Sequence, residues 1–418
     1  MKIERVEVRV VAPKVQRFTW SHDLPEQHMT NTVVRIFTDD GVEGTAGISN
    51  YTSYDFDRYT AETLRHMIPA LIGKDPLQRE EIWKSLWSRV FPLPPGALAV
   101  IDIALWDLLG KQANLPIYQL LGGATDRMLS YASTPLFEDI TTYLNFVEQM
   151  LEQGFRAIKF HCWCLPQKDL ELSRAVRKEF PDENVAFMLD VENNYDLSSS
   201  LRVARELEDL AFTWFEAPLM DFDLEGYQFL TSQGKVDIVP SGNWIQDLPA
   251  YERALREKCW SRARTDVTVC GGLTPARKYM SLIEAKGMKC EIMSWGNTLV
   301  SAANLHLMLG TGMSSYYEQS VPDEPRRCTA DDCACIGIEF SAYDQLPADL
   351  FHMLLITNAR HMVTDGFTLN VIVSHMQEFL GKAGIMFSQS LFDAFPPADQ
   401  IPDKAPNHNG SNGHHDEL

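Results

Sequence analysis

The chain has 418 residues, of which 45% are hydrophobic and 22% are charged, as expected for a globular protein of two domains. Its 37 basic and 57 acidic residues give a formal net charge of −20. Because nucleic acids and anionic membranes attract basic surfaces, this charge argues against both as the main partner. A small anionic substrate is still compatible with it, since a bound divalent cation reverses the local field inside an acidic protein.

The chain contains no run of about 18 apolar residues, so we expect no transmembrane helix. Residues 1–13 alternate apolar and charged side chains, which indicates an edge strand instead of a signal peptide. The last four residues, His-Asp-Glu-Leu, match an address for retention in the endoplasmic reticulum. Because that address requires prior entry into the secretory route, we interpret it as a chance ending and expect a cytoplasmic protein with free cysteines.

The first part of the chain carries the pattern of a small antiparallel sheet followed by helices. Alternating strands are expected at Ile3–Val11, Thr32–Thr38 and Val42–Ala46, with a hairpin turn at Asp39-Asp40-Gly41. Helical periodicity follows over 56–90 and 96–114, separated by a proline-rich break. We therefore predict an α+β domain over residues 1–125.

From residue 126 to about 325, short apolar runs alternate with helical patterns. The runs are Ala157–His161, Val185–Asp190, Phe212–Glu216, Asp237–Pro240, Arg264–Val269, Lys289–Ile292 and Ser315–Glu318. Strand–helix alternation predicts a parallel sheet, and a (β/α)8 barrel spends about 31 residues on each unit. We therefore predict a (β/α) barrel catalytic domain over residues 126–325.

Most of these runs end in, or just before, a polar residue. Those residues are Lys159, His161, Asp190, Glu216, Asn243, Asp266 and Glu318. Successive steps from Lys159 to Asp266 are 31, 26, 27 and 23 residues. A barrel gathers the C-terminal ends of its strands around one pocket, so these side chains are expected to converge. Strands also end in Asp or Asn to form turns, so each residue alone is a weak signal.

The chain after residue 325 does not continue the pattern. Helices are compatible with 350–363 and 369–380, and residues 396–418, rich in Pro, Asn, Gly and His, are expected to be disordered. We interpret 326–418 as an atypical C-terminal segment, which is either a rebuilt closing segment or wrongly joined sequence.

Seven stretches, taken in order, resemble one family. They are 99–111 with 116–123, Gly154–His161, Phe187–Asp190, Trp214–Pro218, Pro240–Asn243, Asp266–Thr274 and Met293–Gly296. They resemble the enolase superfamily, in particular its mandelate racemase and acid-sugar dehydratase branch, over roughly residues 1–321. The resemblance implies a modified TIM-type barrel with an N-terminal capping domain, whose chemistry starts by removing a proton from the carbon α to a carboxylate.

The resemblance also implies Mg²⁺ as the cofactor. Asp190 and Glu216 stand at the positions of the first two metal ligands. The third position, normally a carboxylate, is Asn243 here. An amide oxygen can bind a cation but brings no charge, so a site completed by Asn243 would bind metal more weakly. Asn243 is equally well interpreted as a turn residue.

The expected catalytic residues also follow from the resemblance. Lys159 stands beside the expected substrate carboxylate, and His161 stands where a second lysine commonly acts as the base. Racemases of this branch pair an Asp with a His on the opposite side of the pocket. Asp266 is present, but Met293 replaces the His, and a thioether cannot move a proton. Glu318 is expected to hydrogen-bond the enediolate oxygen or to act as an acid.

We therefore predict a magnesium-dependent lyase that eliminates water from a small anionic carboxylate, with a sugar acid as the expected substrate. The base of this one-base elimination is His161 or Lys159. A racemase, epimerase or cycloisomerase of the same superfamily is one alternative. A catalytically impaired relative with a binding or structural role is another, favoured by Asn243 and Met293. The resemblance further implies a homo-oligomer and a capping loop, with Phe18, Trp20 and His22, that closes over the substrate.

Overall fold

The structure is a computed structural model that describes residues 1–11, 30–50, 54–90, 95–294 and 298–321. The predictions for the capping loop and for the segment 326–418 lie outside the described residues. Within the described residues, no helix is both long and apolar enough to cross a membrane.

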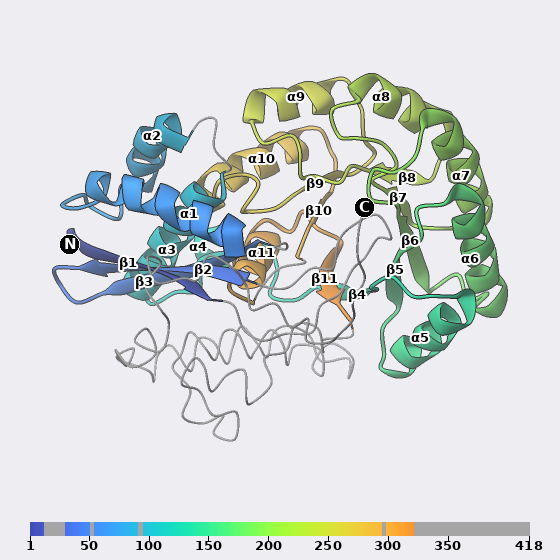
Figure 1. Cartoon of the computed structure of the whole chain (residues 1–418), viewed down its shortest axis with the longest axis horizontal. Helices are drawn as coiled ribbons and strands as arrows, with labels where there is room; N and C mark the ends of the chain where they lie inside the picture. Colours follow the sequence, from blue (N-terminus) through green and yellow to red (C-terminus); the bar gives the residue numbers. More distant parts are fainter. Residues whose placement is uncertain (12–29, 51–53, 91–94, 295–297, 322–418) are drawn as a thin grey trace, which may run out of the picture.

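The N-terminal part is an antiparallel sheet covered on one face by helices (Figure 1). The strands pair in the order β1 (Ile3–Val11), β2 (Thr30–Thr38) and β3 (Glu43–Asn50), so β1 is an edge strand as predicted. The helices are α1 (Tyr54–Met67), the 3₁₀ turn η1 (Ile68–Ala70), α2 (Arg79–Val90), α3 (Gly96–Ala113) and α4 (Ile117–Leu120). Alternate residues of β2, such as Val34 and Ile36, are fully buried beneath the helices.

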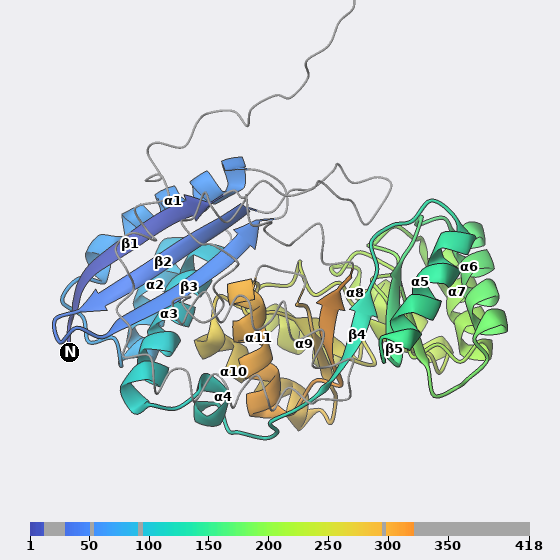
Figure 2. The same ribbon diagram turned by 90° about the horizontal axis from the view of Figure 1, so that it is seen from below.

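Helix α3 is buried on most of its surface, because it packs against β2, β3, α1 and α2 and also against the second domain. An apolar helix without a polar face is a core helix. It ends at Ala113, and the next residue, Asn114, adopts the left-handed conformation with φ of 51° and caps the helix. Figure 2 shows the sheet and α3 beside the second domain.

The second domain alternates strands and helices. The strands are β4 (Leu129–Ser133), β5 (Ala157–His161), β6 (Ala186–Asp190), β7 (Trp214–Glu216), β8 (Asp237–Val239), β9 (Ala263–Thr265), β10 (Cys290–Ile292) and β11 (Tyr316–Ser320). The helices between them are α5 (Ile140–Glu152), α6 (Pro166–Glu179), α7 (Leu197–Asp209), α8 (Leu224–Gln233), α9 (Leu248–Arg256), α10 (Leu273–Ala285) and α11 (Thr298–Thr311). They lie outside the strands in Figure 1.

The strands form a curled parallel sheet. One hydrogen-bonded group runs β11-β4-β5-β6-β7-β8, and β9 pairs with β10. Because β11 pairs with β4, the last strand lies beside the first, as barrel closure requires. The predicted modified TIM-type barrel with an N-terminal capping domain is confirmed.

Side chains fill the inside of the barrel. A buried layer of Tyr131, Ala157, Met188, Trp214 and Val239 occupies the middle. An inward-pointing layer of this kind makes the barrel a packed core instead of a pore, so that chemistry is confined to the strand ends above it.

Gly272 fixes the junction between the two domains. Its φ is +121°, and a Cβ on it would lie 2.3 Å from Oδ2 of Asp102. That oxygen accepts the Thr274 backbone N–H at 2.8 Å and so caps the start of α10.

Gly272→Ala is expected to lower the free energy of unfolding by about 2–5 kcal/mol, because it adds the strain of a positive φ to a steric clash. Gly287→Ala is the matched control, since Gly287 also has a positive φ of +67° but no heavy atom within 4 Å of the added Cβ. Urea denaturation measures both variants. Equal losses in both would show that the contact with Asp102 does not matter.

Candidate active site

Three candidate residues lie side by side at the C-terminal edge of the sheet. In the register of the parallel strands, His161 of β5 faces Asp190 of β6, and Asp190 faces Glu216 of β7. All three are buried. The register of these strands therefore brings together residues that are 29 and 26 positions apart in the sequence.

Lys159 is the centre of a buried charge network. Its Nζ lies 3.0 Å from Oδ2 of Asp190, 2.8 Å from Oε1 of Glu216 and 2.8 Å from Oε1 of Glu318. Burial acts to lower the pKa of Lys159, but the charges of Glu216 and Glu318 outweigh it and raise the pKa well above its ordinary value. All three ammonium protons have carboxylate partners, so Lys159 is a charged positioning group in this arrangement.

Arg264 on β9 belongs to the same network, and the sequence analysis did not identify it. Its Nη2 lies 2.9 Å from Oε1 of Glu216 and 3.1 Å from Oε2 of Glu318, and the side chain is buried. The sequence did carry a signal for Arg264, because it is a charged residue in a predicted strand, two positions before Asp266. Alternation along the strand places positions 264 and 266 on the same side.

Glu318 also belongs to the Lys159 network, and its ion pairs and hydrogen bonds favour the ionised carboxylate. Besides Lys159 and Arg264, the Ser133 hydroxyl donates to Oε1 and the Ser294 backbone N–H donates to Oε2, each at 3.1 Å. Burial acts to raise the pKa of Glu318, but the charges of Lys159 and Arg264 lower it to about 2. A carboxylate in this state accepts hydrogen bonds and has no proton to give, so the geometry does not favour the predicted role as an acid.

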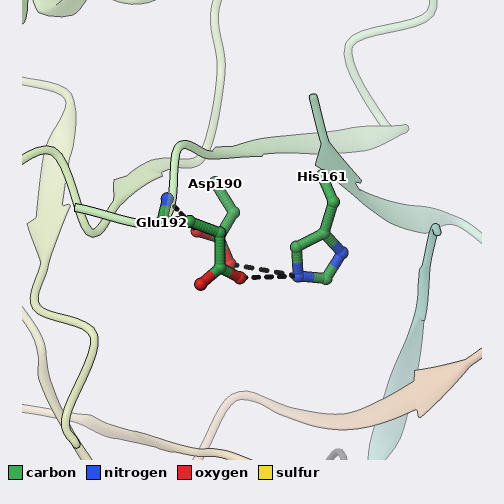
Figure 3. A group of neighbouring side chains, drawn as sticks. All are labelled: His161, Asp190 and Glu192. Atoms are coloured by element: carbon green, nitrogen blue, oxygen red, sulfur yellow. Dashed lines mark hydrogen bonds and ion pairs between the residues drawn. The ribbon is translucent and has the colours of Figure 1, made fainter. Parts of the chain in front are cut away.

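His161 is the last residue of β5, two positions after Lys159. Its Nδ1 lies 2.5 Å from the Thr134 carbonyl oxygen, which fixes a proton on Nδ1 and leaves Nε2 for proton transfer. Nε2 is 3.3 Å from Oδ2 of Asp190 and 3.4 Å from Oε1 of Glu192 (Figure 3). Burial and the Lys159 charge act to lower the pKa of His161, but the hydrogen bonds to Asp190 and Glu192 outweigh them and raise it to about 10.

Glu192 is a second residue that the sequence analysis did not identify. One ligand atom each from His161, Asp190 and Glu192 lies within 4.8 Å of the other two, which is close enough to hold a metal ion. The only signal in the sequence was an acid two residues beyond Asp190.

Asn243 does not join this group. Its side chain is exposed and forms no hydrogen bond with the described residues. Its backbone N–H donates to Oδ2 of buried Asp221 at 3.1 Å, and its carbonyl accepts from Gln246. The same Asp221 carboxylate binds Ser241 and Trp244, so it holds the whole turn. The sequence allowed Asn243 to be a metal ligand or a turn residue. The structure places it in a turn, and its role as a metal ligand stays a prediction.

Asp266 is buried but stands apart from the Lys159 network. Its Oδ1 accepts the Val269 backbone N–H at 2.8 Å, and burial raises its pKa to about 6. It forms no hydrogen bond or ion pair with Lys159 or His161. Met293, which follows β10, provides no acid–base group beside it.

Comparison with known proteins agrees with this fold. Residues 5–122 match the mandelate racemase/muconate lactonizing enzyme N-terminal domain, and residues 142–335 match the enolase C-terminal domain-like family. A crystal structure described as a candidate mandelate racemase/muconate lactonizing enzyme from Pseudovibrio sp. is 38% identical, with a TM-score of 0.74 over 78% of this chain and 87% of that one.

Two further relatives carry names of different reactions. The D-glucarate dehydratase from Agrobacterium tumefaciens, solved in complex with magnesium, is 28% identical, with a TM-score of 0.65 over 76% of this chain and 86% of that one. The N-succinyl-L-Arg/Lys racemase of Bacillus cereus is 25% identical over 70% of this chain and 80% of its own length. Similarity therefore establishes the family but does not choose between the reactions. The chain belongs to the mandelate racemase/muconate lactonizing enzyme family of the enolase superfamily.

Proposed function

We propose that the chain is a magnesium-dependent lyase that removes the α-proton of a hydroxylated carboxylic acid, with a sugar acid as the substrate class, and eliminates water. The observation that carries this proposal is the one-sided placement of acid–base groups. His161 stands with its Nε2 toward the carboxylates, whereas Asp266 on the other side has Met293 where a base would be needed. Racemisation by two bases requires proton donors on opposite faces, but a syn elimination of water requires only one.

The residues at the strand ends fit a divalent cation. Asp190 and Glu216 offer hard oxygen ligands, and both contact the same Lys159 nitrogen, so they converge on one point. When Asp190, Glu192, Glu216 and Glu318 are all ionised and His161 is neutral, the four carboxylates exceed the charges of Lys159 and Arg264 by two. A divalent cation balances that excess. When bound, it would stabilise the negative charge that develops on the substrate carboxylate.

His161 performs the proton transfers in this proposal. Its Nε2 takes the proton from the α-carbon, while the Thr134 carbonyl holds the ring through Nδ1. The resulting imidazolium then gives that proton to the β-hydroxyl on the same face, the carbon–oxygen bond breaks, and water leaves. The enol that remains rearranges to a 2-keto acid.

His161 must be neutral to start this sequence. Its pKa of about 10 depends on hydrogen bonds to two ionised carboxylates, Asp190 and Glu192. Neutralisation of these carboxylates removes the interaction that favours the imidazolium, and the pKa is then expected to fall toward its ordinary value. The groups that bind the cation therefore also control the base.

The test is incubation of the purified protein with Mg²⁺ and a panel of aldonic and aldaric acids, in heavy water, followed by NMR and an assay for 2-keto acids. Release of a 2-keto acid that stops on chelation of the metal supports the proposal. Exchange of the α-hydrogen without dehydration would favour a racemase or epimerase instead. No product and no exchange across a broad panel would favour a binding or structural role.

A further inference from the structure

We propose that a cleft between α2 of the capping domain and α10 of the barrel binds a small oxyanion, a phosphate or a carboxylate, through Arg79 and Arg277. Arg79 is the first residue of α2, and Arg277 lies in α10. Both helices lie outside the barrel strands that carry the candidate active site. The oxyanion site is therefore separate from the proposed reaction and does not depend on it.

Both domains contribute to the cleft. The helices α2 and α10 pack against each other, and the cleft has a volume of about 260 Å³. Pockets for drug-sized ligands span about 300–1,000 Å³, so this cleft suits a smaller molecule. Its lining residues are Leu77, Gln78, Arg79, Glu80, Glu81 and Arg277. Because the last of these belongs to the barrel and the others to the capping domain, a bound molecule would contact both domains.

Trp106 of α3 holds the two guanidinium groups beside the cleft. The guanidinium carbon of Arg79 lies 4.5 Å from the centre of the Trp106 ring, and that of Arg277 lies 5.2 Å from it. Trp106 is buried, and its Nε1 donates to the Thr274 hydroxyl at 2.9 Å, which fixes the ring. Two positive charges held beside one ring repel each other, and an anion that contacts both removes that repulsion.

The carboxylate next to Arg79 in the sequence is engaged with other cations. Oε1 of Glu80 lies 3.2 Å from Nη2 of Arg277, and its Oε2 lies 2.8 Å from Nζ of Lys278. Among the described residues, Nη1 of Arg79 is shielded from solvent and has no hydrogen-bond partner. The ring of Trp106 therefore positions Arg79, but the described part of the chain gives this Nη1 no acceptor.

The pKa of Arg79 agrees with this incomplete pairing. Burial lowers this pKa below its ordinary value, and the attraction of the Asp102 charge does not outweigh the burial. Arg262 is also partly buried, but its pKa is raised, because a hydrogen bond to Asp237 and the charge of Glu291 outweigh its burial. The charge of Arg79 is therefore less well compensated than that of Arg262.

The charge around the cleft is positive, although the chain as a whole is acidic, with a formal net charge of −20. Cations exceed anions by one among the charged side chains on and around the cleft. The cations are Arg79, Arg277, Lys278 and Lys74, and the anions are Glu80, Glu81 and Asp102. An oxyanion balances this excess, and its oxygens accept hydrogen bonds from guanidinium groups in favourable geometry.

Glu80 is the competitor for this site within the protein, because its carboxylate already contacts Arg277 and Lys278. Glu80→Gln removes the competing negative charge and keeps the size of the side chain. We therefore expect Glu80→Gln to bind the oxyanion more tightly than the wild type does.

Calorimetric titration of the full chain in chelator, with inorganic phosphate and separately with succinate, tests the site. Arg79→Gln is expected to weaken binding by at least about tenfold, because a hydrogen bond between a guanidinium and an anion contributes about that factor. Arg256→Gln is the charge control, since it removes one positive charge from α9, where the Arg256 side chain is 57% exposed. It should bind like the wild type.

Binding of phosphate, succinate or both supports the proposal when Arg79→Gln weakens it, and the anion that binds more tightly identifies the ligand class. If neither anion binds at about 10 mM, or if Arg79→Gln binds as well as the wild type, the proposal is overturned. Circular dichroism and thermal melts without added anion check the fold. Arg79→Lys, which keeps the charge, should bind more tightly than Arg79→Gln. The proposed reaction is tested separately, by release of a 2-keto acid in Mg²⁺.

Discussion

Replacement of His161 by asparagine is expected to lower the rate of 2-keto acid formation by about 10²–10⁴-fold, because a positioned general base contributes acceleration of that order. Asparagine can still donate a hydrogen bond to the Thr134 carbonyl, so the local backbone is expected to persist. The loss should appear in kcat and equally in the exchange of the α-hydrogen in heavy water. Mg²⁺ affinity should change little, since the proposal leaves His161 out of the ligand set.

His66→Asn is the matched control for that experiment. His66 lies in the last turn of α1 in the capping domain and is exposed, far along the chain from the strand ends. It should keep the wild-type rate. If His161→Asn retained activity within tenfold of the wild type, the base would lie elsewhere. A large loss of Mg²⁺ binding in His161→Asn would instead identify the imidazole as a metal ligand.

Lys159→Met is expected to lower the free energy of unfolding by about 3–5 kcal/mol, because removal of one partner leaves buried charges without compensation. The carboxylates of Asp190, Glu216 and Glu318 all contact the ammonium group that this variant removes. Urea denaturation in the presence of a chelator measures the loss. Saturating Mg²⁺ should restore part of it, because a ligand that binds only the folded state stabilises that state.

Lys235→Met is the control for Lys159→Met. The Lys235 side chain is 90% exposed, and its Nζ lies 4.0 Å from Glu208. Exposed ion pairs of this kind contribute about 0–1 kcal/mol, so the variant should be nearly neutral. Equal destabilisation of the two variants would contradict the view that Lys159 holds the network together.

The fold was predictable because its signals repeat along the chain. The strands of the barrel are short, mostly apolar runs, several of which end in a polar residue. The structure places β5, β6 and β7 within two residues of the predicted bounds. The sixth strand differed. It was predicted to extend to Val269 but ends at Thr265, because the Asp266 carboxylate accepts the Val269 backbone N–H and turns the chain. The apolar Val267 is still fully buried, which explains why its segment resembled a strand.

The site was predictable only in part, for physical reasons. His161, Asp190 and Glu216 end strands that pair in register, and Lys159 lies two residues before the end of β5, so their spacing carried the signal. Glu192 lies two residues beyond the end of β6, and its position depends on its left-handed φ. A glutamate does not indicate that conformation, so the sequence carried no signal for it. Arg264 begins a predicted strand and does not end one, so it did not match the pattern of the other candidates. Its spacing of two residues from Asp266 still indicated that both side chains lie on the same face of the strand. Asn243 was expected to lie with the other ligands because of strand order alone. In the structure, the Asp221 carboxylate fixes the turn that contains Asn243.

Crystals grown with Mn²⁺ in place of Mg²⁺, with anomalous diffraction recorded near the manganese edge, test the central claim most directly. We predict one strong anomalous peak within coordination distance of the carboxylates of both Asp190 and Glu216. A peak that contacts only one of these carboxylates, or no peak at the strand ends at saturating metal, would contradict the account.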